Sequence, residues 1–164
     1  MTDSIHQMAA EILRRCRAGS IKIATAESCT GGMIAAALTA IAGSSDVFEC
    51  GFVVYSNAAK TQMLGVPAEL ISAYGAVSAE VARALAQGAC LKSNVGLALS
   101  VTGVAGPGHS DNKPEGLVYL GLAANGLVPI AKRFDYGAIG RGNVRSSATR
   151  DALRLVLATL NSAE

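Results

Sequence analysis

The sequence predicts a three-layer α/β/α sandwich with a mixed, mostly parallel central sheet. Short apolar segments typical of strands alternate with helical segments, and this alternation is typical of a sheet that is covered by helices. Two later apolar segments flank Asn125-Gly126, a dipeptide that favours a tight hairpin and therefore an antiparallel pair. With 164 residues, of which 51% are hydrophobic and 16% charged, the chain is expected to form a single domain over residues 1–164.

Helices are expected where apolar residues recur with helical spacing between a capping residue and a stop signal. The first helix has one apolar face and ends at Gly19. Thr30, Asn57 and Ser78 are expected N-caps, and Pro67 suits the first position of a helix. The expected helical ranges are 4–18, 30–41, 58–64, 67–74, 78–91 and 142–160.

Strands are expected over 21–25, 48–56, 95–101, 117–124 and 127–134. The range 48–56 is largely apolar, so we expect this strand to be buried. Between the third and fourth strands, residues 102–116 are rich in Gly and Pro. A loop of this length is unusual within a domain unless it serves a function.

Composition and charge argue against several classes of protein. The net charge is only +2 and the basic residues are spread along the chain, so no nucleic-acid partner is expected. The longest apolar stretch, 33–42, is too short to span a membrane, and the N-terminus does not resemble a signal peptide. The four cysteines form no CxxC pair, so we expect free thiols, a cytoplasmic location and no metal site.

The first candidate for chemistry is Ser28, in the segment 26–32 (AESCTGG) between a predicted strand and a predicted helix. The start of a helix presents free N–H groups that can hold an oxyanion or a phosphate, and glycines allow a ligand to approach the backbone. Cys29 is the rival nucleophile, although no histidine partner is evident. An ordinary capped turn is the alternative interpretation of this segment.

The second candidate is Lys60, in the segment 55–60 (YSNAAK). If Asn57 caps a helix, Lys60 lies in its first turn, where the helix dipole and partial burial both lower the pKa of an ammonium. Only His6 and His109 are present, and neither is well placed, so a hydrolytic serine would need such a lysine as its base. The alternative is a lysine exposed to solvent.

Two further signals accompany these candidates. A glycine-rich segment, 100–108 (SVTGVAGPG), follows the third predicted strand. Arg141 and Arg145 are four residues apart, so they share a helical face and are candidates for binding a phosphate. Each of these signals is weak alone, because flexible connections and solvated arginines are common.

Together the motifs resemble one family. Four of them occur in order: AESCTGG at 26–32, YSNAAK at 55–60, SVTGVAGPG at 100–108 and KPEGLVYLG at 113–121. This order is similar to the C-terminal domain family of the competence/damage-inducible protein CinA, which also includes stand-alone nicotinamide-nucleotide amidases. The likeness covers roughly residues 5–160, and four ordered motifs are far more specific than any one of them.

The resemblance implies cofactor-free hydrolysis of nicotinamide mononucleotide, a pyridine nucleotide, to nicotinic acid mononucleotide and ammonia in pyridine-nucleotide recycling. It implies catalysis by Ser28, Tyr55 and Lys60. Neutral Lys60 would take the Ser28 proton directly or through Tyr55, and N–H groups at the helix start would stabilise the oxyanion. The substrate contacts that it implies are Thr30, Gly31, Gly32, Asn57, Thr102, Gly103 and Arg145.

The sequence departs from the family in two respects. The loop after Gly106 is compact and carries His109, and the N-terminal domain of the longer CinA proteins has no counterpart here. An alternative hypothesis is a non-catalytic, nucleotide-binding regulatory module of the competence or DNA-damage response. The intact set of serine, tyrosine and lysine favours the enzyme. The sequence leaves the oligomeric state open, a homo-oligomer included.

Overall fold

Five strands form one mixed sheet in the order β2-β1-β3-β4-β5 in the computed structural model, which describes residues 3–162. Strands β2, β1 and β3 are parallel, whereas β4 runs antiparallel to both β3 and β5. The predicted mixed sheet is therefore confirmed. The strands are β1 (Ile23–Glu27), β2 (Phe48–Val53), β3 (Leu97–Gly103), β4 (Leu117–Ala124) and β5 (Ile130–Asp135).

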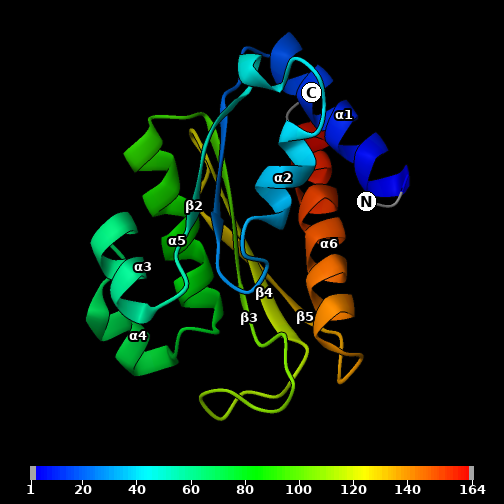
Figure 1. Cartoon of the computed structure of the whole chain (residues 1–164). Helices are drawn as coiled ribbons and strands as arrows, with labels where there is room; N and C mark the ends of the chain where they lie inside the picture. The colour runs from blue at the N-terminus through cyan, green and yellow to red at the C-terminus, as the bar shows by residue number, and fades with distance from the viewer. Residues whose placement is uncertain (1–2, 163–164) are drawn as a thin grey trace.

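Helices cover both faces of this sheet, as the three-layer prediction requires (Figure 1). Helices α1, α2 and α6 lie on one face, and α3, α4 and α5 lie on the other (Figure 1). They are α1 (Asp3–Ala18), α2 (Met33–Thr39), α3 (Asn57–Leu64), α4 (Ala68–Tyr74), α5 (Ala79–Ser93) and α6 (Arg141–Ser162), with a short 3-10 turn η1 (Ser44–Asp46). None of the helices in this described range is both long and apolar enough to cross a membrane.

The two faces of the sheet are packed differently. Toward α1, α2 and α6 the strands present large aliphatic side chains such as Ile23, Leu99 and Leu120. Toward α5 they present small residues, and the Ser100 hydroxyl donates a hydrogen bond of 2.6 Å to the carbonyl of Ala82 in α5. A Cβ on Gly121 would lie 2.2 Å from that same carbonyl oxygen. Helix α5 therefore lies directly against the backbone of β3 and β4.

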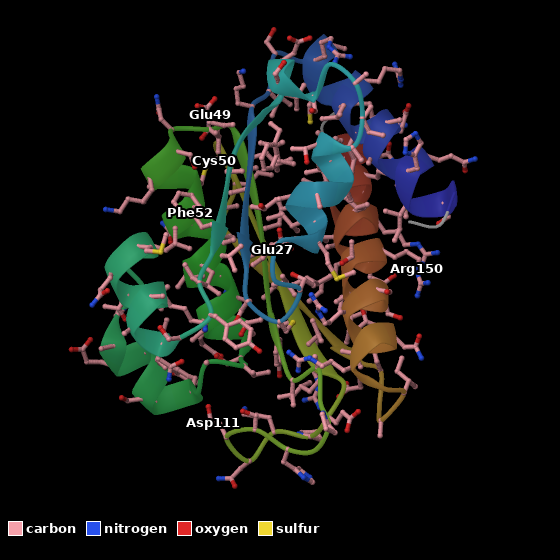
Figure 2. The ribbon with its side chains drawn as sticks, viewed as in Figure 1. Glu27, Glu49, Cys50, Phe52, Asp111 and Arg150 are labelled. Carbon is pink, nitrogen blue, oxygen red and sulfur yellow. The ribbon has the colours of Figure 1, made fainter. Side chains whose placement is uncertain are left out.

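Strand β2 corrects one expectation. The strand was expected to be buried over 48–56, yet it is an edge strand that ends at Val53 and pairs only with β1. Its residues alternate between half-buried and exposed; Cys50 and Phe52 pack against the core under α5, while Glu49 is exposed (Figure 2). An apolar segment does not reveal whether its strand is central or at an edge, because half-buried positions at an edge also accept apolar residues.

Two of the expected helix caps are wrong by a few residues. Helix α2 begins after Gly32, which has a φ of 101°, and not at Thr30. Helix α3 is capped by Ser56 rather than Asn57, because the Ser56 hydroxyl accepts a hydrogen bond of 3.0 Å from the N–H of Ala59. Ser78 caps α5 as expected, with its hydroxyl 3.3 Å from the N–H of Val81.

Candidate functional site

The candidate site lies where the three parallel strands end. The carboxyl ends of β2, β1 and β3 meet at one edge of the sheet, the usual position for a ligand site in an open α/β sheet. A cavity of about 160 Å³ opens there. Six of the residues expected from the sequence line it: Ser28, Tyr55, Asn57, Lys60, Thr102 and Gly103.

Ser28 is the first residue after β1, and its side chain lines the cavity while only 8% of the residue is exposed. Its N–H donates to the carbonyl of Val101 in β3 at 3.1 Å, which fixes the backbone of the turn against the neighbouring strand. Among residues 3–162 its hydroxyl has no hydrogen-bond partner. An enclosed hydroxyl without a partner is free to meet a substrate atom.

Glu27 is a buried residue whose role the sequence did not predict. Its carboxylate accepts hydrogen bonds from the Thr30 hydroxyl at 2.7 Å, the N–H of Ile34 at 2.8 Å and the N–H of Ala35 at 2.9 Å. Figure 2 shows Glu27 between β1 and α2. The expectation that N–H groups at the start of this helix face a ligand is therefore wrong for Ile34 and Ala35, because Glu27 caps them.

The rest of the turn after β1 is held by Arg145. Its guanidinium donates to the carbonyls of Cys29 and Thr30, both at 3.1 Å. Neither Arg145 nor the segment 30–32 lines the cavity, although both are expected substrate contacts. The N–H groups of Cys29, Thr30 and Gly32 have no backbone acceptor in the described part of the chain. Of these three residues Cys29 alone lines the cavity, so its N–H is the donor available beside Ser28.

Lys60 lies in the first turn of α3, as predicted, and it is buried with 2% of the residue exposed. Its Nζ donates to the backbone carbonyl of Tyr55 at 2.9 Å. Burial lowers the pKa of the Lys60 ammonium below its usual range, because the charged form loses hydration. The site therefore favours a neutral amine more than water does.

Cys29 also lines the cavity, but its chemistry differs from that of Ser28. The thiol is buried, and this burial raises the pKa of Cys29 to about 12. The nucleophilic form of cysteine is the thiolate, so a thiol with this pKa is a weak nucleophile near neutral pH. The rival nucleophile is thereby disfavoured.

Arg141 is a cavity residue that was singled out only as one of a pair. It is the first residue of α6, and its guanidinium donates to the carbonyl of Gly106 at 2.8 Å and to the hydroxyl of Tyr55 at 3.2 Å. Of the two arginines four residues apart, Arg141 lines the cavity and Arg145 does not. The helical spacing predicts that the two arginines share a face. It cannot predict which of them binds the carbonyls of the turn after β1 and which lines the cavity.

The third strand and the loop after it complete the site. The Thr102 hydroxyl donates to the carbonyl of Ala76 at 2.8 Å, and Gly103 packs so tightly that a Cβ would lie 2.6 Å from Val118 Cγ2. In the loop, Ser110 and Asp111 line the cavity, whereas His109 is exposed. The loop thus closes one side of the site with polar groups.

Comparison with known proteins shows the family. Residues 5–160 match the family model for the CinA C-terminal domain. The chain belongs to the CinA C-terminal domain family. A CinA-like protein of Citrifermentans bemidjiense is 54% identical over 138 residues, which is 84% of this chain and 33% of that protein. A putative competence-damage inducible protein of Caldicellulosiruptor bescii is 46% identical over 138 residues, 83% of this chain and 33% of that protein.

Solved structures of CinA proteins share the fold. The competence/damage inducible protein CihA from Agrobacterium tumefaciens superimposes with a TM-score of 0.94 at 44% identity, covering 98% of each chain. A CinA superfamily protein from Escherichia coli gives a TM-score of 0.90 at 31% identity and covers 96% of this chain and 92% of that one. This chain spans about a third of the length of the CinA-like relatives it matches.

Proposed function

We propose that this CinA-family chain hydrolyses the carboxamide of nicotinamide mononucleotide to nicotinic acid mononucleotide and ammonia. One observation carries the proposal: a buried lysine, Lys60, lines the same cavity as the enclosed, unpartnered hydroxyl of Ser28. Burying a lysine is costly unless the amine is neutral or paired. A module that only binds nucleotides does not need a buried lysine, whereas a serine hydrolase can use the neutral amine as its base.

Lys60 is the base that best suits Ser28. The two histidines, His6 and His109, are exposed and lie outside the cavity. Arg141 lines the cavity but does not lose its proton in proteins. The lowered pKa of Lys60 moves it toward the range in which a general base works near neutral pH.

The reaction is an acyl transfer in two steps. Neutral Lys60 takes the proton of Ser28, directly or through Tyr55, while Ser28 Oγ attacks the carboxamide carbon. The N–H of Cys29, a residue that lines the cavity, has no backbone acceptor within residues 3–162 and is the donor available for the oxyanion. The C–N bond then breaks as Lys60 returns the proton to the leaving ammonia. Water, deprotonated by Lys60, cleaves the acyl ester, and the proton returns to Ser28.

The test is to incubate purified protein with nicotinamide mononucleotide and measure both ammonia and the nucleotide product. We expect one ammonia for each nicotinic acid mononucleotide, with the activity unchanged after exhaustive treatment with a chelator. Activity that the chelator removes and a divalent cation restores would contradict the serine–lysine mechanism. Binding of the nucleotide without any product would instead support the regulatory module.

A further inference from the structure

We propose that Arg141 selects an anionic amide over an uncharged one, by binding the phosphate of the substrate. This inference rests on the proposed function and assigns a specificity role to a residue outside the serine, tyrosine and lysine set. Ser28 and Arg141 line the same cavity, from the ends of different elements. A substrate whose amide contacts Ser28 therefore lies in a cavity that Arg141 also lines.

The contacts of Arg141 leave it able to bind a ligand. Its two hydrogen-bond partners are neutral, the carbonyl of Gly106 and the hydroxyl of Tyr55. A guanidinium has five N–H donors, so three remain, and Arg141 forms no ion pair within residues 3–162. Guanidinium groups with free donors bind phosphate strongly, because the hydrogen bonds are charge-assisted and can be bidentate.

The surroundings of Arg141 also favour an anion. The residue begins α6, a helix of 22 residues whose first turn contains no acidic side chain. The positive end of the helix dipole therefore adds to the guanidinium charge. A Cβ on Gly142 would have no atom within 4 Å, so the space beside the first turn is open. These features support Arg141 and would not define a site without the cavity and Ser28.

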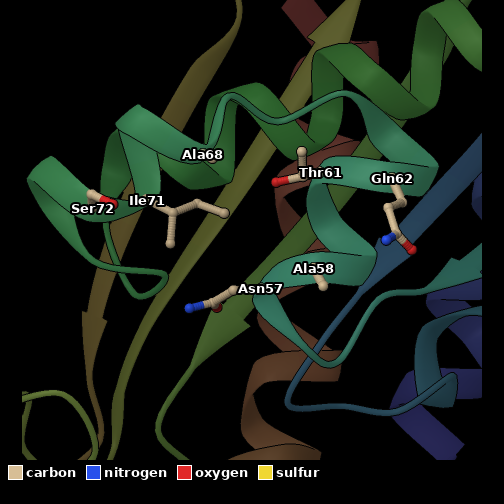
Figure 3. Close-up of a pocket in the computed structure, with 7 residues that line it drawn as sticks. All are labelled: Asn57, Ala58, Thr61, Gln62, Ala68, Ile71 and Ser72. Atoms are coloured by element: carbon tan, nitrogen blue, oxygen red, sulfur yellow. The ribbon is translucent and has the colours of Figure 1, made fainter.

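Two neighbouring cavities are poorer places for a phosphate. One, of about 330 Å³, lies between α3 and α4 and is lined by uncharged side chains, among them Asn57, Thr61 and Gln62 (Figure 3). The other, of about 450 Å³, has Lys113 on its wall, but also Asp111 and the carboxyl end of α4. Asp111 also lines the cavity of Arg141, so its carboxylate does not distinguish the two places. The negative end of α4 opposes an anion beside Lys113, and Lys113 is therefore the weaker candidate.

The remaining cations near the site have other roles. Lys60 is buried and donates to the carbonyl of Tyr55, and Arg145 donates to the carbonyls of Cys29 and Thr30 away from the cavity. Neither presents a free charged face to a substrate that enters the cavity. Arg141 is thus the cation on the cavity wall that is both charged and open to a phosphate.

The experiment compares Arg141→Gln and Arg141→Lys with wild type on nicotinamide mononucleotide and on nicotinamide riboside, which has the same carboxamide and no phosphate. Lys113→Gln is the matched control, because it removes the other nearby cation. We expect Arg141→Gln to lower the ratio of kcat/KM for the nucleotide to kcat/KM for the riboside by roughly tenfold to a hundredfold. For Arg141→Lys this ratio should lie between those of wild type and Arg141→Gln. Lys113→Gln should change the ratio less than about threefold.

The ratio separates phosphate binding from a role in positioning Tyr55, because a positioning defect slows both substrates equally. Equal losses on both substrates would overturn the inference, as would a drop in the ratio caused by Lys113→Gln. Calorimetric dissociation constants for both ligands, measured on Ser28→Ala with and without Arg141→Gln, give the same ratio without turnover. Selective binding that depends on Arg141 in a protein that releases no ammonia would retain the inference and reject the proposed function.

Discussion

The turn after β1, which carries Ser28, is held by more side-chain hydrogen bonds than the turn after β2, which carries Tyr55. Glu27 caps the first turn through three hydrogen bonds, and Arg145 binds two of its carbonyls. The second turn follows an edge strand, and its helix α3 has one side-chain cap, Ser56. The first turn is buried between neighbouring strands, while Tyr55 in the second is 61% exposed.

This difference indicates how the two proposed catalytic groups are placed. The nucleophile belongs to a turn that is fixed by buried charge-assisted hydrogen bonds. The base belongs to a short helix near the surface, in which Lys60 and Leu64 are the buried residues. Substitutions in the two turns should therefore have different consequences for activity and stability.

The largest effect is expected for Ser28→Ala in the first turn. Loss of a covalent nucleophile should lower kcat by at least about a thousandfold while the fold and nucleotide binding persist. The rate of ammonia release measures kcat, and circular dichroism checks that the variant is folded. Cys29→Ala is the matched neighbour and should retain most activity, since burial keeps that thiol protonated. A reversed pattern would identify the thiol as the nucleophile.

Lys60→Arg in the second turn should cost somewhat less, roughly 10² to 10⁴ in kcat, because arginine keeps the charge but cannot accept a proton. In the wild type, the rate should rise with pH through the lowered pKa of Lys60, since only the neutral amine accepts the Ser28 proton. The measurement is kcat and KM across pH. A change confined to KM would assign Lys60 to binding.

Glu27→Ala should destabilise the protein by about 3 kcal/mol, measured by urea unfolding, because it leaves buried donors of the first turn without an acceptor. The amide variant Glu27→Gln should cost less, since its carbonyl oxygen still accepts. Activity should fall with both variants, because Ser28 is the next residue. If Glu27→Ala were as stable as wild type, the first turn would not depend on its carboxylate.

The smallest effect is expected for the cap of the second turn. Ser56→Ala should destabilise by about 1 kcal/mol through loss of the hydrogen bond to the N–H of Ala59. Asn57→Ala is the control: Asn57 was the expected cap and is not the observed one, so this variant should change the unfolding free energy less. Equal costs would mean that Ser56 contributes no more to the start of α3 than Asn57 does.

Much of this architecture could be predicted from the sequence, for reasons that are local. Hydrophobic periodicity and capping residues gave the order of strands and helices, and Asn125-Gly126 correctly indicated an antiparallel pair. The turn itself spans 125–129, because β5 begins only after Pro129, which has no N–H for pairing. The cavity also gathers Ser28 and Lys60 from separate motifs, as expected of residues at the ends of parallel strands.

The features that could not be predicted from the sequence depend on contacts between residues far apart in the chain. No local pattern shows that the side chain of Glu27 turns to the start of α2, because a glutamate in a strand is usually exposed. The different positions of Arg141 and Arg145 follow from how α6 packs beside the turn after β1, which is not encoded in their spacing. The edge position of β2 likewise depends on strand order.

The close contact of α5 with β3 and β4 has a consequence for amide hydrogen exchange. Because Gly121 and Ser100 leave no room between the helix and the sheet, these elements should open only when the whole molecule unfolds. The end of α3 meets α5 just as closely, because a Cβ on Gly88 would lie 2.1 Å from the carbonyl oxygen of Leu64. The exposed start of α3, residues 57–58, should therefore exchange faster than its buried end. The proposed site thus joins the slowly exchanging sheet to the faster-exchanging first turn of α3.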